Sequence, residues 1–309
     1  MPERITHIVD SRDLPRGWIE DFFEESKRMK DAVKSKRGFQ PEDKMGCAIF
    51  DEPSNITLRS FQRAIGHLRW TPLSSPEVRE RSMWPSTPQR EIEVLNAIGF
   101  NFIIVRNPEA GYAKSAAEYS KVPVFNAGES FRGNRFLHPS EHPTQVLADI
   151  DLIKSHHGKL DSLRMAIVGD PRGNPVVNSL LFIATKFEIE IVLVSKGGRF
   201  ALPVEVETHL SEHKTSITKT ADLHSQLPYV DVVYFAPPAS QTLNSITDHY
   251  EDLMGEREFS LLPKGSIVLS DMLRGKTPPI IDDPRFIEEL QIENGVYARM
   301  AMMKMLVSP

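Results

Sequence analysis

Cysteine is almost absent from this chain of 309 residues, in which Cys47 is the single one. One cysteine excludes an intrachain disulfide and any metal site built on a Cys-x-x-Cys pair. Long apolar runs are absent too, since none approaches the ~20 residues that a membrane span needs. Positive charge is not in excess, because 37 basic residues face 42 acidic ones, which counts against a general nucleic-acid binder. We therefore expect no membrane and no nucleic-acid partner.

The overall composition is that of a globular protein. Hydrophobic residues make up 40% and charged residues 26% of the chain, which argues against disorder. At ~150 residues per domain, this length predicts about two domains, each with its own core. The first residues lack the apolar core of a signal peptide, so we expect a cytoplasmic protein.

Short apolar runs alternate with amphipathic segments along the whole chain. The apolar runs predict strands at 45–50, 101–105, 122–128, 163–170, 189–196, 231–238 and 265–272. The helical spacing of apolar residues predicts helices at 14–36, 57–68, 90–98, 142–157, 176–187, 209–213 and 296–307. Near-continuous apolar strands that alternate with helices are typical of parallel sheets covered on both faces. The predicted fold class is therefore α/β, with two doubly wound parallel-sheet domains.

Candidate binding residues follow the carboxyl ends of these strands, where ligands bind in open α/β sheets. Ser54 and Thr57 stand at a strand-to-helix junction, where free backbone N–H groups can bind an anion. The simpler interpretation, that Ser54 only caps the helix, is favoured by sequence alone. Arg106 directly follows an apolar strand, and a position on the open surface is equally consistent with that placement.

A second candidate group begins the predicted helix 142–157. His142 and Gln145 are three residues apart and share a helix face, so together they can contact a carbonyl oxygen and an amide. By contrast, the segment GDPRGNP lacks the Gly-x-Gly-x-x-Gly spacing and contains two prolines, so it predicts a tight turn rather than a nucleotide site. His138, His156 and His157 have no carboxylate at ligand spacing, and we expect no metal there.

Several motifs occur together in an informative order. They are FDEPSNITLRSF, FIIVRNPEAG, VPVFNAG followed by HPTQVLADI, LDSLRMAIVGD, and the closing GVYARMAMMKML. In this combination the chain resembles the aspartate/ornithine carbamoyltransferase family, most closely its aspartate branch. The resemblance extends over almost the whole sequence.

The resemblance implies a domain organisation and a reaction. A carbamoyl-phosphate-type domain is expected at 1–141, with the closing helix 287–309 packed back on it, and an amino-acid-binding domain at 142–286. The reaction is attack of an amino group on the carbonyl of carbamoyl phosphate, without a metal or an organic cofactor. The implied assembly is a homotrimer with sites between subunits, and a second protein subunit is a possible further partner beside the small-molecule substrate.

The resemblance also implies roles for individual residues. The predicted catalytic residues match positions that hold the carbamoyl carbonyl and amide: Thr57, Arg106, His142 and Gln145. The predicted substrate-binding residues are Ser54, Asn55, Ser86, Met272, Leu273 and Arg274. Ser54 matches a phosphate contact, Ser86 falls near the lysine position of the neighbouring subunit's loop, and 272–274 stand where the family has His-Pro-Leu-Pro-Arg.

The departures from the family pattern concern its anion-binding positions. The two arginines of the Ser-Thr-Arg-Thr-Arg motif are replaced by Ile56 and Leu58. The positions that grip the acceptor's carboxylates are occupied by Pro175, Pro237 and Ala239. Phosphate recognition needs positive charge and forked donors, which arginine supplies and these residues do not. We therefore predict a pocket that keeps its carbonyl donors and has lost its anion sites.

Three hypotheses follow from this pattern. The first is an enzyme that binds or transfers a carbamoyl or carboxamide group, with an acceptor less anionic than aspartate. The second is a catalytically silent relative that serves as a trimeric scaffold or a partner subunit. The third is an ordinary aspartate carbamoyltransferase in which arginines from outside the motifs refill the site, for which the candidates are Arg81, Arg90, Arg132 and Arg172.

Overall fold

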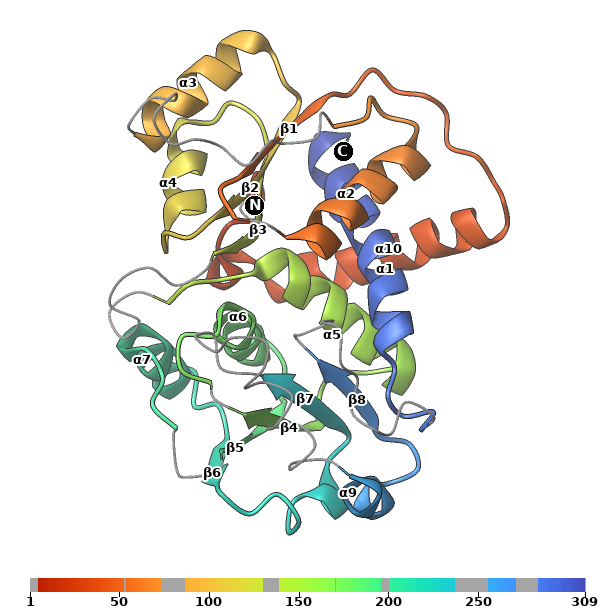
Figure 1. The fold of residues 1–309 in the computed structure, drawn as a ribbon, viewed down its shortest axis with the longest axis vertical. Coiled ribbons are helices and arrows are strands. Elements are labelled where there is room, and N and C mark those ends of the chain that lie inside the picture. The colour runs from red at the N-terminus through yellow and green to blue at the C-terminus, as the bar shows by residue number, and fades with distance from the viewer. Residues whose placement is uncertain are drawn as a thin grey trace. The chain divides into compact units, whose positions relative to one another are not determined.

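The fold is described from a computed structural model, in which the chain divides into two compact units (Figure 1). The first unit comprises Met1–Gly133, Ser140–Asp151 and Ile292–Pro309, and the second comprises Asn134–Pro139 and Leu152–Gln291. The structure describes residues 5–52, 54–73, 87–129, 139–169, 171–195, 200–236, 255–270 and 283–308. Within these ranges, none of the helices combines the length and the apolar character of a membrane span.

The first unit is built on a parallel sheet of three strands in the order β1-β2-β3. The strands are β1 (Gly46–Phe50), β2 (Phe102–Asn107) and β3 (Val124–Glu129). Its helical elements are η1 (Ser11–Asp13), α1 (Arg16–Lys34), α2 (Asn55–Leu68), α3 (Pro88–Ile98) and α4 (Tyr112–Tyr119). Two further helices, α5 (Pro143–His157) and α10 (Glu288–Val307), contribute to both units.

The second unit has a five-stranded parallel sheet in the order β6-β5-β4-β7-β8. The strands are β4 (Arg164–Gly169), β5 (Glu190–Val194), β6 (Ile217–Thr220), β7 (Val232–Ala236) and β8 (Ile267–Ser270). The helical elements are α6 (Pro175–Ala184), α7 (Val204–Glu212), η3 (Leu227–Tyr229) and α9 (Glu256–Leu261). The change of direction at β4, from which the chain runs first to β5 and later to β7, is typical of a doubly wound sheet.

Each unit has its own apolar core, and this explains the near-continuous hydrophobic strands. In the first unit, Ile49, Ile103 and Val105 are buried beside residues of α3 and α4. In the second unit, Val192, Val233 and Val268 are buried in one cluster with residues of η3 and α9. Strands of this kind, buried and joined by helical crossovers, confirm the predicted α/β class with parallel sheets.

The sequence predicted most helices and strands correctly, but it placed several of their ends at the wrong residues. The helix predicted at 209–213 is the end of the longer α7, and the last helix begins at Glu288 rather than 296. Helix α4 and strand β6 were not predicted at all. Strand β6 has no fully buried residue, so it carries little of the apolar pattern that identifies a strand.

Candidate active site

The carboxyl ends of the three strands of the first unit form one edge of its sheet. Phe50 of β1 pairs with Arg106 of β2, and the N–H of Asp51 donates to the Arg106 carbonyl at 2.9 Å. Strand β3 continues beyond this level to Gly128 and Glu129. The parallel register therefore places Arg106 and the β3 terminus at the same edge, as expected for a site in an open sheet.

Arg106 and His142 meet at the backbone of Gly128. The Arg106 Nη1 donates to the Ala127 carbonyl at 3.0 Å. A Cβ atom built on Gly128 would lie 2.2 Å from Arg106 Nη1 and 2.7 Å from His142 Cδ2. The backbone φ of Gly128 is +111°, which side-chain-bearing residues rarely adopt. A glycine is thus required here so that two polar side chains can approach the strand end.

His142 is held in place by the start of α5. The hydroxyl of Thr144 donates to the Asn126 carbonyl at 2.7 Å, which ties the first turn of α5 to β3. Burial lowers the pKa of His142 well below its ordinary value, and the charges of Arg106 and Arg299 lower it further. The ring is therefore neutral at neutral pH and offers one N–H donor and one acceptor nitrogen.

Gln145 is oriented by a buried arginine from the other end of the chain. Arg299 of α10 donates from Nη2 to Gln145 Oε1 at 3.0 Å and from Nη1 to the Gly295 carbonyl at 2.8 Å. Gln145 in turn donates from Nε2 to Asp149 Oδ1 at 2.9 Å. Because both ends of the Gln145 amide are bonded, its remaining lone pair on Oε1 has a fixed direction.

Arg299 itself is 2% exposed and lies over the Phe61 ring of α2, with its Cζ 5.1 Å from the ring centroid. Burial lowers its pKa to about 10, which leaves it protonated at neutral pH. Arg299 lies in the closing motif of the family resemblance, but no role was predicted for this residue. The signal was present, since a single arginine in the apolar run GVYARMAMM is unusual unless it has buried partners.

The start of α2 carries three of the predicted residues. Thr57 is buried, Asn55 is exposed, and Ser54 occupies the N-cap position. Ser54 thus occupies the predicted cap position, but its side chain makes no capping hydrogen bond. The first-turn N–H groups of α2 therefore receive no acceptor from the residue that usually provides one.

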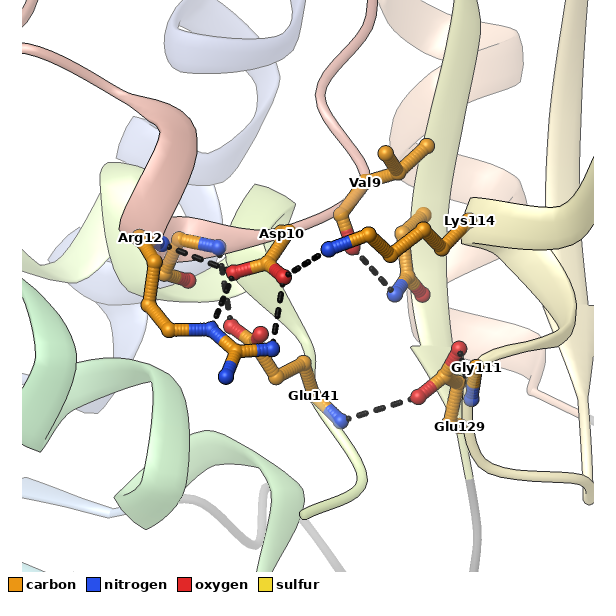
Figure 2. Close-up of polar contacts among 9 residues, drawn as sticks. Val9, Asp10, Arg12, Gly111, Lys114, Glu129 and Glu141 are labelled. Atoms are coloured by element: carbon orange, nitrogen blue, oxygen red, sulfur yellow. Dashed lines mark hydrogen bonds and ion pairs between the residues drawn. The ribbon is translucent and has the colours of Figure 1, made fainter. Parts of the chain in front are cut away.

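A cluster of carboxylates includes Glu129 and Glu141, which are the sequence neighbours of Gly128 and His142 (Figure 2). The Glu129 N–H donates to the Glu141 carbonyl at 3.0 Å, and the Glu141 N–H donates to Glu129 Oε2 at 3.1 Å. Glu129 also accepts from the Gly111 N–H at 3.1 Å. Burial raises the pKa of Glu129 to about 7. These bonds join the residue after Gly128 to the residue before His142, and so hold the two segments together.

Asp10 completes this cluster from the N-terminal segment (Figure 2). It accepts from Arg12 Nη2 at 2.7 Å and from Lys114 Nζ at 3.0 Å. Although burial alone would raise the pKa of Asp10, the hydrogen bond and charge of Arg12 hold it below its ordinary value. Burial raises the pKa of Glu141 well above its ordinary value, as does the charge of Asp10. Asp10 is therefore the more acidic of these two neighbouring carboxyl groups.

In the second unit, the start of α6 is capped by the side chain of Asn174. Asn174 Oδ1 accepts from the Val176 and Val177 N–H groups at 2.9 and 3.1 Å, and Pro175 has no N–H. The preceding segment forms the predicted tight turn, in which the Asn174 N–H donates to the Pro171 carbonyl at 3.3 Å. The remaining predicted positions lie outside the described residues: Ser86, Pro237, Ala239, Met272, Leu273 and Arg274.

Comparison with known proteins extends over both units. The Aspartate/ornithine carbamoyltransferase, carbamoyl-P binding domain family matches residues 6–155, and the Asp/Orn binding domain family matches residues 161–306. The chloroplastic aspartate carbamoyltransferase of Oryza sativa subsp. japonica is 27% identical and covers 98% of this chain and 85% of its own. The aspartate carbamoyltransferase catalytic subunit of Methanocaldococcus jannaschii is 26% identical, with 97% of each chain covered.

Solved structures show the same fold. Aspartate transcarbamoylase from Trypanosoma cruzi in complex with carbamoyl phosphate matches with a TM-score of 0.83 at 21% identity, over 97% of this chain and 95% of that one. The catalytic subunit of M. jannaschii aspartate transcarbamoylase matches with a TM-score of 0.80 at 24% identity, over 98% of each chain. With both of its halves matched, the chain belongs to the aspartate/ornithine carbamoyltransferase family.

Proposed function

We propose that this protein binds a carbamoyl group at the sheet edge of the first unit and transfers it to a small amino-containing acceptor less anionic than aspartate. The observation that carries the proposal is the packing of Arg106 and His142 around Gly128. Two donor side chains directed at one strand end form a preorganised site for an oxygen that gains negative charge. The chain's family membership supports the carbamoyl group as the ligand.

The proposed reaction uses these side chains without transferring a proton to His142. The amino nitrogen of the acceptor attacks the carbamoyl carbon, the leaving group departs with its bonding electron pair, and the amine proton passes to that leaving group or to water. Arg106 and the N–H of the neutral His142 stabilise the developing oxyanion, and Thr57 donates to the same oxygen. Gln145, held by Arg299, orients the carbamoyl NH2 through its free lone pair on Oε1.

The proposed loss of strong anion binding is supported by the start of α2. Ile56, at an arginine position of the family motif, is 37% exposed. An apolar side chain at this place supplies no charge to a phosphate, although the uncapped N–H groups of α2 still attract a weakly bound anion. In the second unit, Pro175 stands at an arginine position of the family and Asn174 occupies the first N–H donors of α6, so this turn offers an acceptor carboxylate neither a charge nor these donors.

Aspartate as the acceptor is the second candidate function, favoured by the names of the curated relatives. It requires replacement cations. Among the four arginines suggested for this role, Arg90 pairs with Glu93 at 3.1 Å on the surface of α3. Arg172 lies half-buried in the turn before α6, and Arg81 and Arg132 lie outside the described residues. We also propose that the protein is cytoplasmic and forms a homotrimer in which a neighbouring subunit contributes Ser86. A second protein subunit is a further proposed partner, which the printed name "catalytic subunit" of relatives supports.

Calorimetry with carbamoyl phosphate, inorganic phosphate, urea and acetamide tests the proposal. We expect urea or acetamide to bind. Carbamoyl phosphate should bind at most about tenfold more tightly, which corresponds to ~1.4 kcal/mol, because Ile56 supplies no charge to the phosphate. His142→Ala should abolish this binding. His67→Ala, which removes a histidine from the far end of α2, should leave it unchanged.

Transfer is measured by mass spectrometry of carbamoylated products after incubation with carbamoyl phosphate and a panel of amines. Product from a neutral or singly charged amine that disappears in His142→Ala supports the proposal. Tight binding of carbamoyl phosphate with efficient carbamoylation of aspartate would overturn it in favour of the second candidate. A chain that binds none of the four ligands would instead be a silent family member.

A further inference from the structure

Two histidines and a glutamate come together at the end of α7 in the second unit. His209 and His213 are four residues apart and therefore lie on the same helix face, and Glu212 precedes the second histidine. One ligand atom from each of the three side chains lies within 4.8 Å of the other two. His209 is half-buried, whereas Glu212 and His213 are exposed. None of these residues belongs to the candidate site of the first unit.

The ring of His209 is fixed by a contact with α6. The Thr185 hydroxyl donates its hydrogen to the Phe182 carbonyl at 2.7 Å. The same oxygen lies 3.2 Å from His209 Nε2, and with its own hydrogen already used it accepts from that nitrogen. The proton of the neutral ring is therefore on Nε2, and the lone pair is on Nδ1. The edge-on contact with Phe182, at 5.1 Å between ring centroids, further restricts the ring.

The ring of His213 is fixed in the same way by the helix end. Its Nδ1 lies 2.8 Å from the His209 carbonyl oxygen. A carbonyl only accepts, so Nδ1 carries the proton and Nε2 carries the lone pair. Each imidazole thus donates one N–H to a protein oxygen, which orients its ring beside the other. This is the arrangement by which proteins orient histidines that bind a metal ion.

We propose that His209, Glu212 and His213 bind one divalent transition-metal ion of the Zn²⁺, Ni²⁺ or Cu²⁺ class. Imidazole nitrogens with a carboxylate suit these ions, whereas Mg²⁺ and Ca²⁺ prefer sites made wholly of oxygen. Tetrahedral Zn²⁺ holds its ligand atoms about 3.3 Å apart. Glu212 is exposed, and its flexible side chain can close the remaining distance to the two oriented imidazoles. Because Thr185 links His209 to α6, the bound ion fastens the last turn of α7 to that helix.

Calorimetric titration of the full chain with ZnCl2, and separately with MgCl2, tests this site. We expect one Zn²⁺ per chain, no Mg²⁺ binding, and a melting temperature that rises with Zn²⁺ concentration because the ion binds the folded state. His213→Gln should weaken Zn²⁺ binding at least tenfold and remove the rise. Since His213 is exposed, this variant should melt like the original chain in the absence of metal.

Two control variants distinguish the site from general histidine binding. His224→Gln removes a single imidazole paired with Glu258 at 2.6 Å, and His156→Gln breaks up the neighbouring histidines at 156 and 157. Both variants should bind Zn²⁺ like the original chain. Paramagnetic resonance of bound Cu²⁺ should show two nitrogen ligands in the original chain and one in His213→Gln. Unchanged Zn²⁺ affinity in His213→Gln, or loss of binding in His156→Gln, would overturn the proposal.

Discussion

The two units begin a comparable helix in opposite ways. Helix α6 of the second unit follows β4, and Asn174 occupies its first N–H groups at 2.9 and 3.1 Å. Helix α2 of the first unit follows β1, and its N-cap residue Ser54 makes no such bond. A strand-to-helix turn that is closed by its own side chain is structural, whereas an uncapped turn retains donors for a ligand. The first turn of α2 therefore lacks the side-chain acceptor that closes the first turn of α6.

The glycines at two strand ends, Gly128 and Gly169, differ in what surrounds them. At Gly128 of β3, the atoms within 3.1 Å of an added Cβ belong to the Arg106 and His142 side chains. At Gly169 of β4, an added Cβ would lie 2.1 Å from the backbone oxygen of Ala236. Both glycines have positive φ, at +111° and +135°. The first makes room for functional side chains, and the second makes room for the neighbouring strand.

The largest expected effect is a loss of stability when either of these two glycines is replaced by alanine. Gly169→Ala should destabilise the chain by about 3–5 kcal/mol, because overpacking against a rigid backbone adds to backbone strain. Gly128→Ala should cost only about 2 kcal/mol, since the Arg106 guanidinium can move away, but it should abolish urea or acetamide binding. Chemical denaturation and calorimetry measure the two effects. Gly111→Ala, at a φ of +81° with nothing within 4 Å, is the control for strain alone; equal losses in all three variants would contradict the comparison.

The carboxylate cluster of the first unit predicts a pH effect. Since burial raises the pKa of Glu129 from 4.5 to about 7, the folded chain holds this proton where the unfolded chain has lost it. The stability contributed by this group is therefore lost as pH rises from about 4.5 to about 7, by about 3 kcal/mol. Denaturation of Glu129→Gln across that range should show a smaller decline than the original chain. The exposed Glu118→Gln should not, and identical slopes for Glu129→Gln and the original chain would contradict the assignment.

An arginine introduced at position 56, at the start of α2, should restore phosphate binding to the first unit. Ile56→Arg places a guanidinium beside the uncapped first turn, and a hydrogen bond to a charged group is worth about 1.5–3 kcal/mol. Phosphate affinity should therefore rise at least about tenfold, as measured by calorimetry. Gln62→Arg adds the same charge farther along α2 and should change the affinity little. An original chain that already binds phosphate as tightly as Ile56→Arg would show that other residues supply the charge.

The smallest expected effect is the change in stability when the N-cap residues of α6 and α2 are replaced. Asn174→Ala should lower the free energy of unfolding by about 1 kcal/mol, because two N–H groups of α6 lose their acceptor. Ser54→Ala should change it by less than about 0.5 kcal/mol, as expected for a side chain without a capping bond. Urea denaturation of the two variants compares them directly. A loss at Ser54 as large as that at Asn174 would mean that α2 is capped in solution.

The predictability of the site depended on the range of the contacts. The pairing of His142 with Gln145 was a prediction that sequence could offer, because residue spacing along one segment is a local property. Arg299 contacts Gln145 across 154 positions of the chain, and Ser11 contacts Glu141 across 130. No local pattern indicates such pairs, because helix and strand periodicity describe only which face is buried. The proposed metal site at His209, Glu212 and His213 was not predicted for a related reason, because the orientation of the His209 ring depends on Thr185 at the end of α6.

The sequence by itself determined the alternation of strands and helices, the parallel sheets and the family, because apolar periodicity and short motifs are local features. Tertiary structure alone decided the chemical state of the site. It made His142 neutral, kept Glu129 and Glu141 protonated above their usual pH range, and ionised Asp10 beside Arg12. The physical reason is that protonation depends on burial and on charges brought close by the fold. The single cysteine and the balanced charge of the chain excluded classes of protein, but they could not reveal these states.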